Sequence, residues 1–187
     1  MIKRGFDIFL VVLLLPVIVI FFVLIGVIIY CSSGLPILHW SRRNGQNNNE
    51  FMMPKFRTMQ TDTPEIATHL LKHPEKWLTP IGAFLRRTSI DEFPQLWSIV
   101  KGEMSFVGPR PALFNQYDLI ALRTEFGVHT LKPGLTGWAQ INGRDQNSIE
   151  DKVLFDKEYM EKKSLFFDLS IILQTFRKIS GDKDVSH

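Results

Sequence analysis

One ten-residue stretch, Arg86 to Gln95, concentrates side chains that could carry out phosphate chemistry. It contains two arginines, a threonine–serine pair and the adjacent carboxylates of Asp91 and Glu92. A helix is predicted to begin within it and to end at Gly102, because Pro94 is tolerated in a first turn, where its missing N–H is not needed. Both carboxylates are therefore expected near a helix N-terminus, where free N–H groups favour carboxylates and phosphates alike.

Two interpretations of this stretch compete on the residues alone. The structural one is a capping box, Ser89-x-x-Glu92, with Asp91 as a favourable first-turn charge. The functional one is a nucleophilic carboxylate beside a metal-binding carboxylate, with Arg86 and Arg87 near phosphate groups. Because capping boxes are common, these ten residues do not decide between the two.

Three further cations are candidates for phosphate binding. Lys55 and Arg57 lie two residues apart on a predicted strand, so they are expected on the same face. Arg110 lies between two prolines, and a guanidinium held by a restricted backbone loses less entropy on binding. The alternatives are a solvated face for the pair and a plain turn for Arg110. The cations form a site only if they meet the Asp91 turn.

The N-terminal region is predicted to enter a membrane. The run from Ile8 to Tyr30 is almost purely aliphatic and aromatic, and it exceeds the roughly 20 residues that a bilayer core requires. It is too long for a secretory signal peptide, and no small-x-small cleavage site follows it. Pro16 predicts a kink. Because basic residues flank both ends, the charges give no orientation, and an ordinary tilted span is the simpler prediction from these residues.

The remaining chain predicts an α+β fold with a small β-hairpin and several helices. Residues 37–42 and 50–57 flank a glycine- and asparagine-rich loop that is typical of a hairpin. A glycine-rich loop with a short strand is expected at residues 132–144. Further helices are expected at residues 62–72, 111–126, 149–162 and 164–179. The last is strongly apolar but carries charges within it, so we expect it to lie in the membrane interface.

Composition narrows the classes of function. The chain has 187 residues, a net charge of +3 and a pI near 9.0, which is too little and too scattered a charge to indicate nucleic-acid binding. It suits a surface on anionic lipid or a site that handles phosphates. The single cysteine, Cys31, excludes an intrachain disulfide and a cysteine metal cluster. The histidines His69 and His73 have the spacing of a two-histidine metal site but are interpreted as exposed. A homo-oligomer is left open.

Several stretches together resemble the monotopic phosphoglycosyl transferases, the bacterial sugar transferase family. The matching motifs are Lys55–Met59, Arg87–Leu96, Gly102–Pro111, Lys132–Gln140 and the helix Ser164–Thr175. The resemblance covers nearly the whole chain, and the order and spacing of the motifs make it far more specific than any one of them. It favours the catalytic interpretation of the two carboxylates over capping.

The resemblance implies a reaction. A phospho-sugar passes from a UDP-sugar to a polyprenyl (undecaprenyl) phosphate, which releases UMP and starts the assembly of a lipid-linked glycan. Asp91 is implied to attack the β-phosphorus and to form a covalent phospho-sugar intermediate, and Glu92 is implied to bind Mg²⁺. Carboxylates do serve as phosphoryl nucleophiles, and Mg²⁺ takes carboxylate and phosphate oxygens. Arg110 matches the family's phosphate-binding arginine, and we assign three cations at basic motif positions to phosphate binding: Lys55, Arg57 and Arg87.

The resemblance also implies a re-entrant membrane helix in place of a span. Such a helix enters and leaves on the cytoplasmic face of the bacterial inner membrane, with Pro16 at its break. Many family members have a Ser-Pro pair there, whereas this chain has Leu15 and Pro16, so the hydroxyl that would help the kink is missing. The expected division is a membrane-embedded segment, residues 1–30, and a catalytic domain, residues 31–187, with amphipathic helices at the interface.

Two other functions are compatible with parts of this sequence. One is a membrane-anchored, non-catalytic protein whose basic loops hold lipid head groups, although adjacent acids would weaken simple anion binding. The other is a nucleotide-sugar hydrolase, in which water replaces the lipid phosphate. The sequence does not indicate which sugar is used or which glycan is made, and the roles of Arg86 and Arg144 are not assigned.

Overall fold

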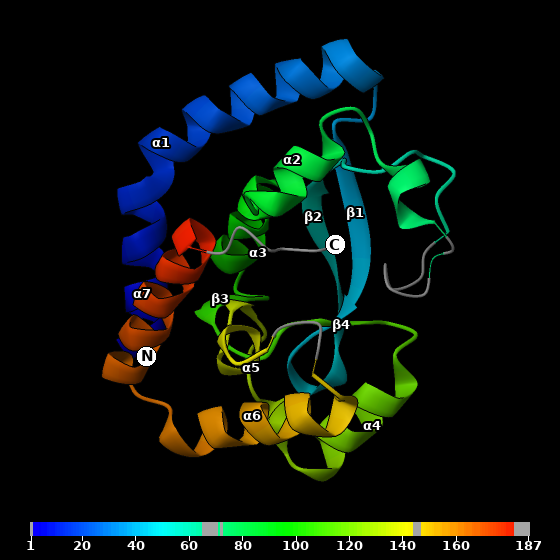
Figure 1. Cartoon of the computed structure of the whole chain (residues 1–187). Coiled ribbons are helices and arrows are strands. Elements are labelled where there is room, and N and C mark those ends of the chain that lie inside the picture. Colours follow the sequence, from blue (N-terminus) through cyan, green and yellow to red (C-terminus); the bar gives the residue numbers. More distant parts are fainter. Residues whose placement is uncertain (1, 65–70, 72, 144–146, 182–187) are drawn as a thin grey trace.

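The fold is α+β, as the sequence predicts, with helices arranged around two small sheets (Figure 1). The computed structural model describes residues 2–64, 71, 73–143 and 147–181. The predicted helix at residues 62–72 and His69 lie largely or wholly outside these residues. A short 3-10 helix, Pro74–Trp77, follows them.

The larger sheet is built on the predicted β-hairpin. Strand β1 (Leu38–Asn44) pairs antiparallel with β2 (Glu50–Phe56), and β4 (Ala112–Leu113) joins the other edge of β1. The helix predicted from residue 111 is therefore wrong at its start. The helix α4 occupies only Tyr117–Glu125, because Ala112 and Leu113 pair with β1 and the helix can begin only after them.

The glycine-rich loop serves close packing of backbone against backbone. Strands β3 (Ser105–Val107) and β5 (Gly134–Thr136) run parallel, and the short helix α5 (Trp138–Ile141) follows. A Cβ atom added at Gly108 would lie 2.3 Å from the carbonyl oxygen of Lys132, and one added at Gly134 would lie 2.1 Å from the amide nitrogen of Gly108. The glycines thus let the loop after β3 lie directly against the loop before β5.

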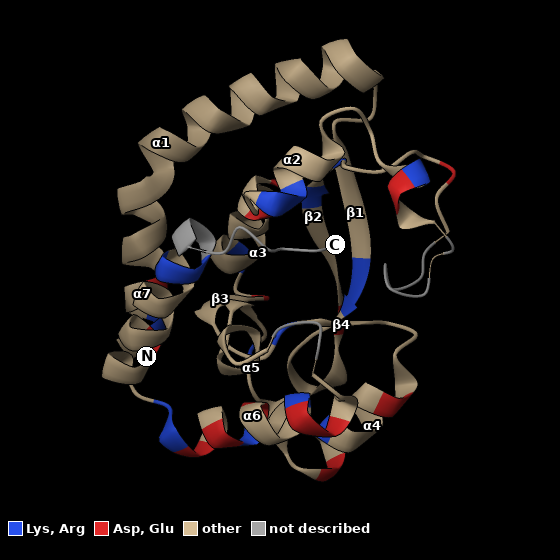
Figure 2. Cartoon of the chain, viewed as in Figure 1, with Lys and Arg blue, Asp and Glu red and all other residues tan. Residues whose placement is uncertain are grey.

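Helix α1 (Ile2–Ser33) is the one described helix long and apolar enough to cross a membrane. Figure 1 shows that it bends along its length, and Pro16, near its midpoint, removes a backbone donor where a kink is expected. Most of its large apolar side chains are exposed, and in Figure 2 most of the α1 ribbon is free of the colours of charged residues. Such a surface is stable in lipid and costly in water.

The first end of α1 is attached to the domain by polar contacts. The Lys3 ammonium donates to Asp168, at 2.5 Å, and to the Tyr159 hydroxyl, at 3.1 Å. The buried Asp7 carboxylate accepts hydrogen bonds from the Ser105 hydroxyl and the Phe106 amide. The N-terminal turns of the membrane helix therefore rest on β3 and on the C-terminal helices.

The second end of α1 is attached by Arg57, just after β2. Its guanidinium donates to the carbonyl oxygens of Ser33, Gly34 and Leu35, at 2.5–2.9 Å. Nearby, Ile25 and Ile29 of α1 are buried in a cluster with two residues of the domain, Phe56 and Leu85. Both ends of the helix thus contact the same globular body.

The other helices carry the walls of the site and the surface. Helix α2 (Gly82–Arg87), the 3-10 helix η4 (Ile90–Gln95) and α3 (Leu96–Lys101) follow one another, and α3 ends at Gly102 as predicted, with φ of 88°. Helix α6 (Ile149–Lys162) has the predicted bounds, and α7 (Leu165–Gly181) nearly so. Helix α7 buries Ile171 but exposes four apolar side chains: Phe166, Leu169, Leu173 and Phe176.

Candidate active site

The site begins at the turn between α2 and α3. Ser89 has a left-handed backbone conformation, with φ of 56°, and it reverses the chain between α2 and η4. Ile90 and Phe93 pack against the cluster beneath α1. Because these two side chains anchor η4 to the core, the intervening Asp91 and Glu92 are directed to the other side, against β2. Asp91 is only 7% exposed.

The two carboxylates meet cations, which contradicts the capping interpretation. Glu92 Oε1 lies 3.0 Å from Lys55 Nζ and 3.2 Å from Arg110 Nη2. Asp91 Oδ2 lies 4.0 Å from the same Lys55 ammonium. The Ser89 side chain makes no capping hydrogen bond, so the capping box is wrong here. Lys55, from β2, and Arg110, from the loop after β3, are brought to the turn as the sequence predicts.

Two predicted phosphate-binding residues lie elsewhere. Arg57 is beyond the end of β2, and its guanidinium holds the end of α1. Arg87 is exposed at the end of α2, and it makes no hydrogen bond or ion pair with any described residue. The strand predicted to carry both residues 55 and 57 ends at Phe56, so strand alternation does not apply to Arg57.

Two arginines near the site were not assigned from the sequence. Arg86 Nε donates to Thr58 Oγ1 at 3.0 Å, and its charge lies close enough to Asp91 for each to influence the other's pKa. Arg43, on β1, donates to the carbonyl oxygen of Pro111 at 3.2 Å. Burial lowers the pKa of Arg43 to about 10, and the nearby Arg110 cation adds to the shift. In the sequence, only the position of Arg43 in the predicted hairpin could have pointed to it as a site residue, because its contact with residue 111 depends on long-range folding.

These groups leave the site positively charged. Four cations, Arg43, Lys55, Arg86 and Arg110, surround the two carboxylates. An anion that entered between them would meet a net attraction, strengthened by the low dielectric of a partly buried site. The excess of cations suits a diphosphate.

The adjacent carboxylates titrate very differently. Burial raises the pKa of Asp91 to about 6; Lys55 opposes the shift and Glu92 adds to it. Burial would also raise the pKa of Glu92, but Lys55 and Arg110 outweigh it through charge and hydrogen bonds, so this pKa is held well below its usual range. Burial lowers the pKa of Lys55 itself. Pairs of groups driven apart in this way are typical of catalytic sites.

The residues of the site fit a magnesium ion only with help from substrate. Among the described residues no group of three or more His, Cys, Asp and Glu side chains could hold a metal. Mg²⁺ characteristically uses one or two carboxylates, substrate phosphates and water in place of a complete protein cage. Asp91 and Glu92 supply such a partial set, and the surrounding cations account for how a phosphate would be held beside them.

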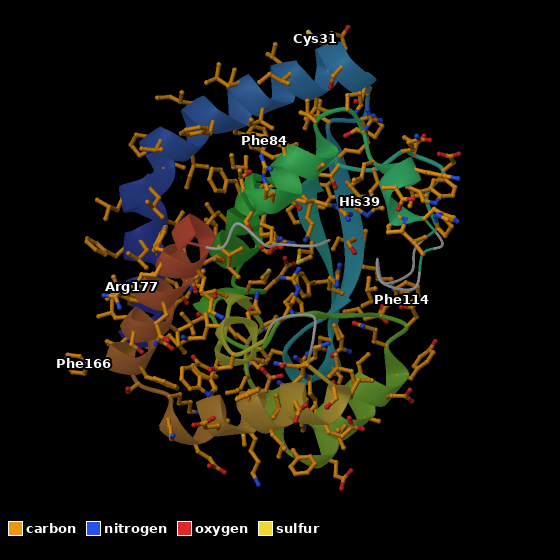
Figure 3. The ribbon with its side chains drawn as sticks, viewed as in Figure 1. Cys31, His39, Phe84, Phe114, Phe166 and Arg177 are labelled. Carbon is orange, nitrogen blue, oxygen red and sulfur yellow. The ribbon has the colours of Figure 1, made fainter. Side chains whose placement is uncertain are left out.

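Figure 3 shows how several labelled side chains lie relative to the helices and strands. Phe166 points away from the protein at the start of α7, whereas His39 lies on β1 among the strands that carry the cations. Phe84, Trp97 and Val100 are exposed apolar residues on α2 and α3, the helices that flank the turn with Asp91 and Glu92. Apolar surface therefore borders the polar site.

Comparison with known proteins agrees with these motifs. The family model described as bacterial sugar transferase matches residues 1–182. The chain is 41% identical over 182 residues to the uncharacterized sugar transferase EpsL of Bacillus subtilis, across 95% of this chain and 86% of that protein. It is 36% identical over 188 residues to the exopolysaccharide production protein ExoY of Sinorhizobium fredii, across 92% of this chain and 83% of that protein.

A larger relative has a more specific name. The chain is 36% identical over 187 residues to the undecaprenyl-phosphate glucose phosphotransferase of Komagataeibacter xylinus, and the match covers 94% of this chain but 35% of that protein. The matched part of that larger protein corresponds to nearly all of the chain described above. With a family match over almost its full length and motifs that converge on one charged turn, the chain belongs to the bacterial sugar transferase family.

Proposed function

We propose that this protein transfers a phospho-sugar from a UDP-sugar to undecaprenyl phosphate, with UMP and undecaprenyl-diphosphate-sugar as products. Family membership and the names of the relatives support the class of reaction and the acceptor. The observation that carries the proposal is the paired carboxylate turn: two adjacent acids with opposite pKa shifts inside a group of four cations.

In the first half-reaction, an Asp91 carboxylate oxygen attacks the β-phosphorus of the donor. A bond forms between that oxygen and phosphorus, and the bond from phosphorus to the bridging oxygen breaks, so the electron pair leaves on UMP. Asp91 is suited to this step because Glu92 engages the closest cations. At 4.0 Å, Lys55 is near enough to favour ionisation of Asp91 without holding its oxygens in a close ion pair.

In the second half-reaction, a phosphate oxygen of the acceptor attacks the same phosphorus. The bond to Asp91 breaks, which restores its carboxylate and leaves the phospho-sugar on the lipid. Lys55, Arg110 and Arg43 provide positive charge for the phosphates throughout. A Mg²⁺ ion held by Glu92 and substrate oxygens would supply further neutralisation of the charge that develops on the phosphoryl group.

The proposed place of reaction is the cytoplasmic face of the inner membrane. A re-entrant α1 is supported by its bend and by the attachment of both its ends to one globular body. The exposed apolar residues of α7 would rest in the interface, where an amphipathic helix is stable. The acceptor phosphate would then approach Asp91 sideways, at the depth of the lipid head groups.

The test follows the β-phosphorus of the donor. A panel of UDP-sugars labelled with ³²P at the β-position is incubated with the purified full chain and Mg²⁺, with and without undecaprenyl phosphate. We expect one or more donors to place label in the organic phase only when the acceptor is present. Label released as a water-soluble sugar phosphate without acceptor would indicate a hydrolase. Unaltered donors throughout would indicate a non-catalytic anion-binding protein.

A further inference from the structure

The loop that carries Arg110 is held by three successive carbonyl groups. The carbonyl oxygen of Pro109 accepts from the Gly134 amide at 2.9 Å. That of Arg110 accepts from Arg123 Nη1 at 2.8 Å, and that of Pro111 accepts from Arg43 Nη1 at 3.2 Å. Because prolines have no N–H to donate, carbonyl acceptors are the principal means of fixing this segment. The donors come from three different elements: β5, α4 and β1.

The middle donor belongs to a buried ion pair away from the catalytic turn. Arg123, on α4, donates from Nε and Nη2 to Asp156 Oδ2 on α6, at 3.0 and 2.6 Å. Arg123 is 9% exposed and Asp156 is 1% exposed. Buried ion pairs often stabilise a fold no better than apolar side chains of the same size would. Stability alone is therefore a weak explanation for this pair, and the third contact of Arg123 suggests another.

We infer that Arg123, held in place by Asp156, is a positioning residue that aims Arg110 into the active site. The pair fixes the guanidinium of Arg123, and its remaining Nη1 donor then fixes the carbonyl of Arg110, whose side chain reaches Glu92 at 3.2 Å. The inference rests on the proposed function in one respect, that Arg110 binds a phosphate. It predicts that Arg123 contributes to anion binding only through Arg110.

A double-mutant cycle tests this dependence. The combined change Arg123→Met with Asp156→Leu removes both partners and replaces them with apolar groups, which avoids leaving an unpaired buried charge. Four proteins are compared: the native chain, the chain with the change at residues 123 and 156, the chain with Arg110→Ala, and the chain with all of these changes. The matched control is Arg42→Met with Glu50→Leu, an exposed ion pair on the same protein. The probe is inorganic pyrophosphate, titrated calorimetrically into the detergent-solubilised full chain.

We expect Arg110→Ala to weaken pyrophosphate binding about 10- to 100-fold, as for loss of a charged hydrogen-bond donor. The change at residues 123 and 156 should weaken it about 5- to 10-fold in the native background and less than about twofold when Arg110 is already alanine. The control should change affinity less than about twofold. If the chain with Arg123→Met and Asp156→Leu does not fold, Arg123→Lys replaces that change in the cycle. This change keeps a positive charge near Asp156 but lacks the forked donors, and its effect on binding should show the same dependence on Arg110.

Other results would overturn the inference. A loss of equal size in both backgrounds would mean that Arg123 acts independently of Arg110. If the native chain did not bind pyrophosphate, the premise that Arg110 binds a phosphate would be wrong. UMP release from the UDP-sugar panel is measured in parallel. Coupled binding without UMP release would reject the proposed function and keep the positioning role. UMP release with an additive cycle would reject the positioning role and keep the function.

Discussion

Asp91 and Glu92 are neighbours in sequence, yet the structure places them in different electrostatic surroundings. Glu92 Oε1 contacts two cations, Lys55 and Arg110, and this holds its pKa low. Asp91 is buried and meets Lys55 only at 4.0 Å, so burial dominates and its pKa rises. One carboxylate is thus held as an anion between two cations, while the other has the more basic oxygen that the proposed attack on phosphorus requires.

The raised pKa of Asp91 predicts an acid limb in the pH dependence. The attacking form is the carboxylate, so the rate constant for UMP release in a single turnover should be maintained above pH 6 and should fall about tenfold per unit below it. The single-turnover reaction with donor alone is the measurement to use, because a phosphate monoester acceptor also titrates near pH 6. Donor-only rates that stay level down to pH 4.5 would contradict the role assigned to Asp91.

At the scale of elements, the sequence predicted what local chemistry determines. The hairpin follows from its turn residues, α3 ends at Gly102, and α6 begins after Ser148, whose hydroxyl accepts from the Asp151 amide. The prediction was wrong where the secondary structure depends on a partner that is distant in sequence. Residues 112–113 form a strand only because β1 lies beside them.

The same reason explains why the contacts of three arginines near the site could not be predicted. Arg57 has the right charge and spacing for a phosphate ligand, but the carbonyls that it holds come from residues 33–35, which reach it only through the fold. Arg43 and Arg123 gave no local signal, because their partners lie 68 and 13 residues away along the chain. Motif resemblance identified Lys55 and Arg110, whose contacts also depend on long-range folding.

The contacts of Arg57 predict that its substitution affects the stability of the fold and not the binding of phosphates. Arg57→Met removes three donors to carbonyl groups at the end of α1, and we expect it to lower the free energy of unfolding by about 2–4 kcal/mol. Arg42→Met, which removes an exposed ion pair, should cost less than about 1 kcal/mol. Urea unfolding in detergent measures both. A normal unfolding midpoint for Arg57→Met, combined with weaker pyrophosphate binding, would return Arg57 to the phosphate site.

At the scale of the whole molecule, α1 and the globular domain form one unit. The Lys3 and Asp7 contacts hold its first end, and Arg57 holds its last, with the exposed apolar side chains between them. Figure 2 shows the charged residues spread over the other elements, with that stretch of the α1 ribbon left uncharged. A polar body that contacts both ends favours a helix that dips into one leaflet over one that crosses the bilayer.

Single cysteines in a Cys31→Ser background test this topology. Ile2 suits the first position because its side chain is 76% exposed, whereas the Lys3 ammonium donates to Asp168. Asn49, at the exposed hairpin loop, marks the domain. Both cysteines should resist a membrane-impermeant thiol reagent in intact cells and react after the inner membrane is opened. Labelling of the Ile2 position alone in intact cells would mean that α1 spans.

The central claim is that Asp91 carries the phospho-sugar between donor and acceptor. The direct measurement is peptide mass spectrometry after acid quench of the full chain with an active UDP-sugar and no acceptor. We expect one added phospho-sugar mass on the peptide that contains Asp91, its disappearance when undecaprenyl phosphate is added before the quench, and its absence in Asp91→Asn with the unfolding midpoint unchanged. The same mass on a different residue, or undiminished turnover by Asp91→Asn, would contradict the mechanism.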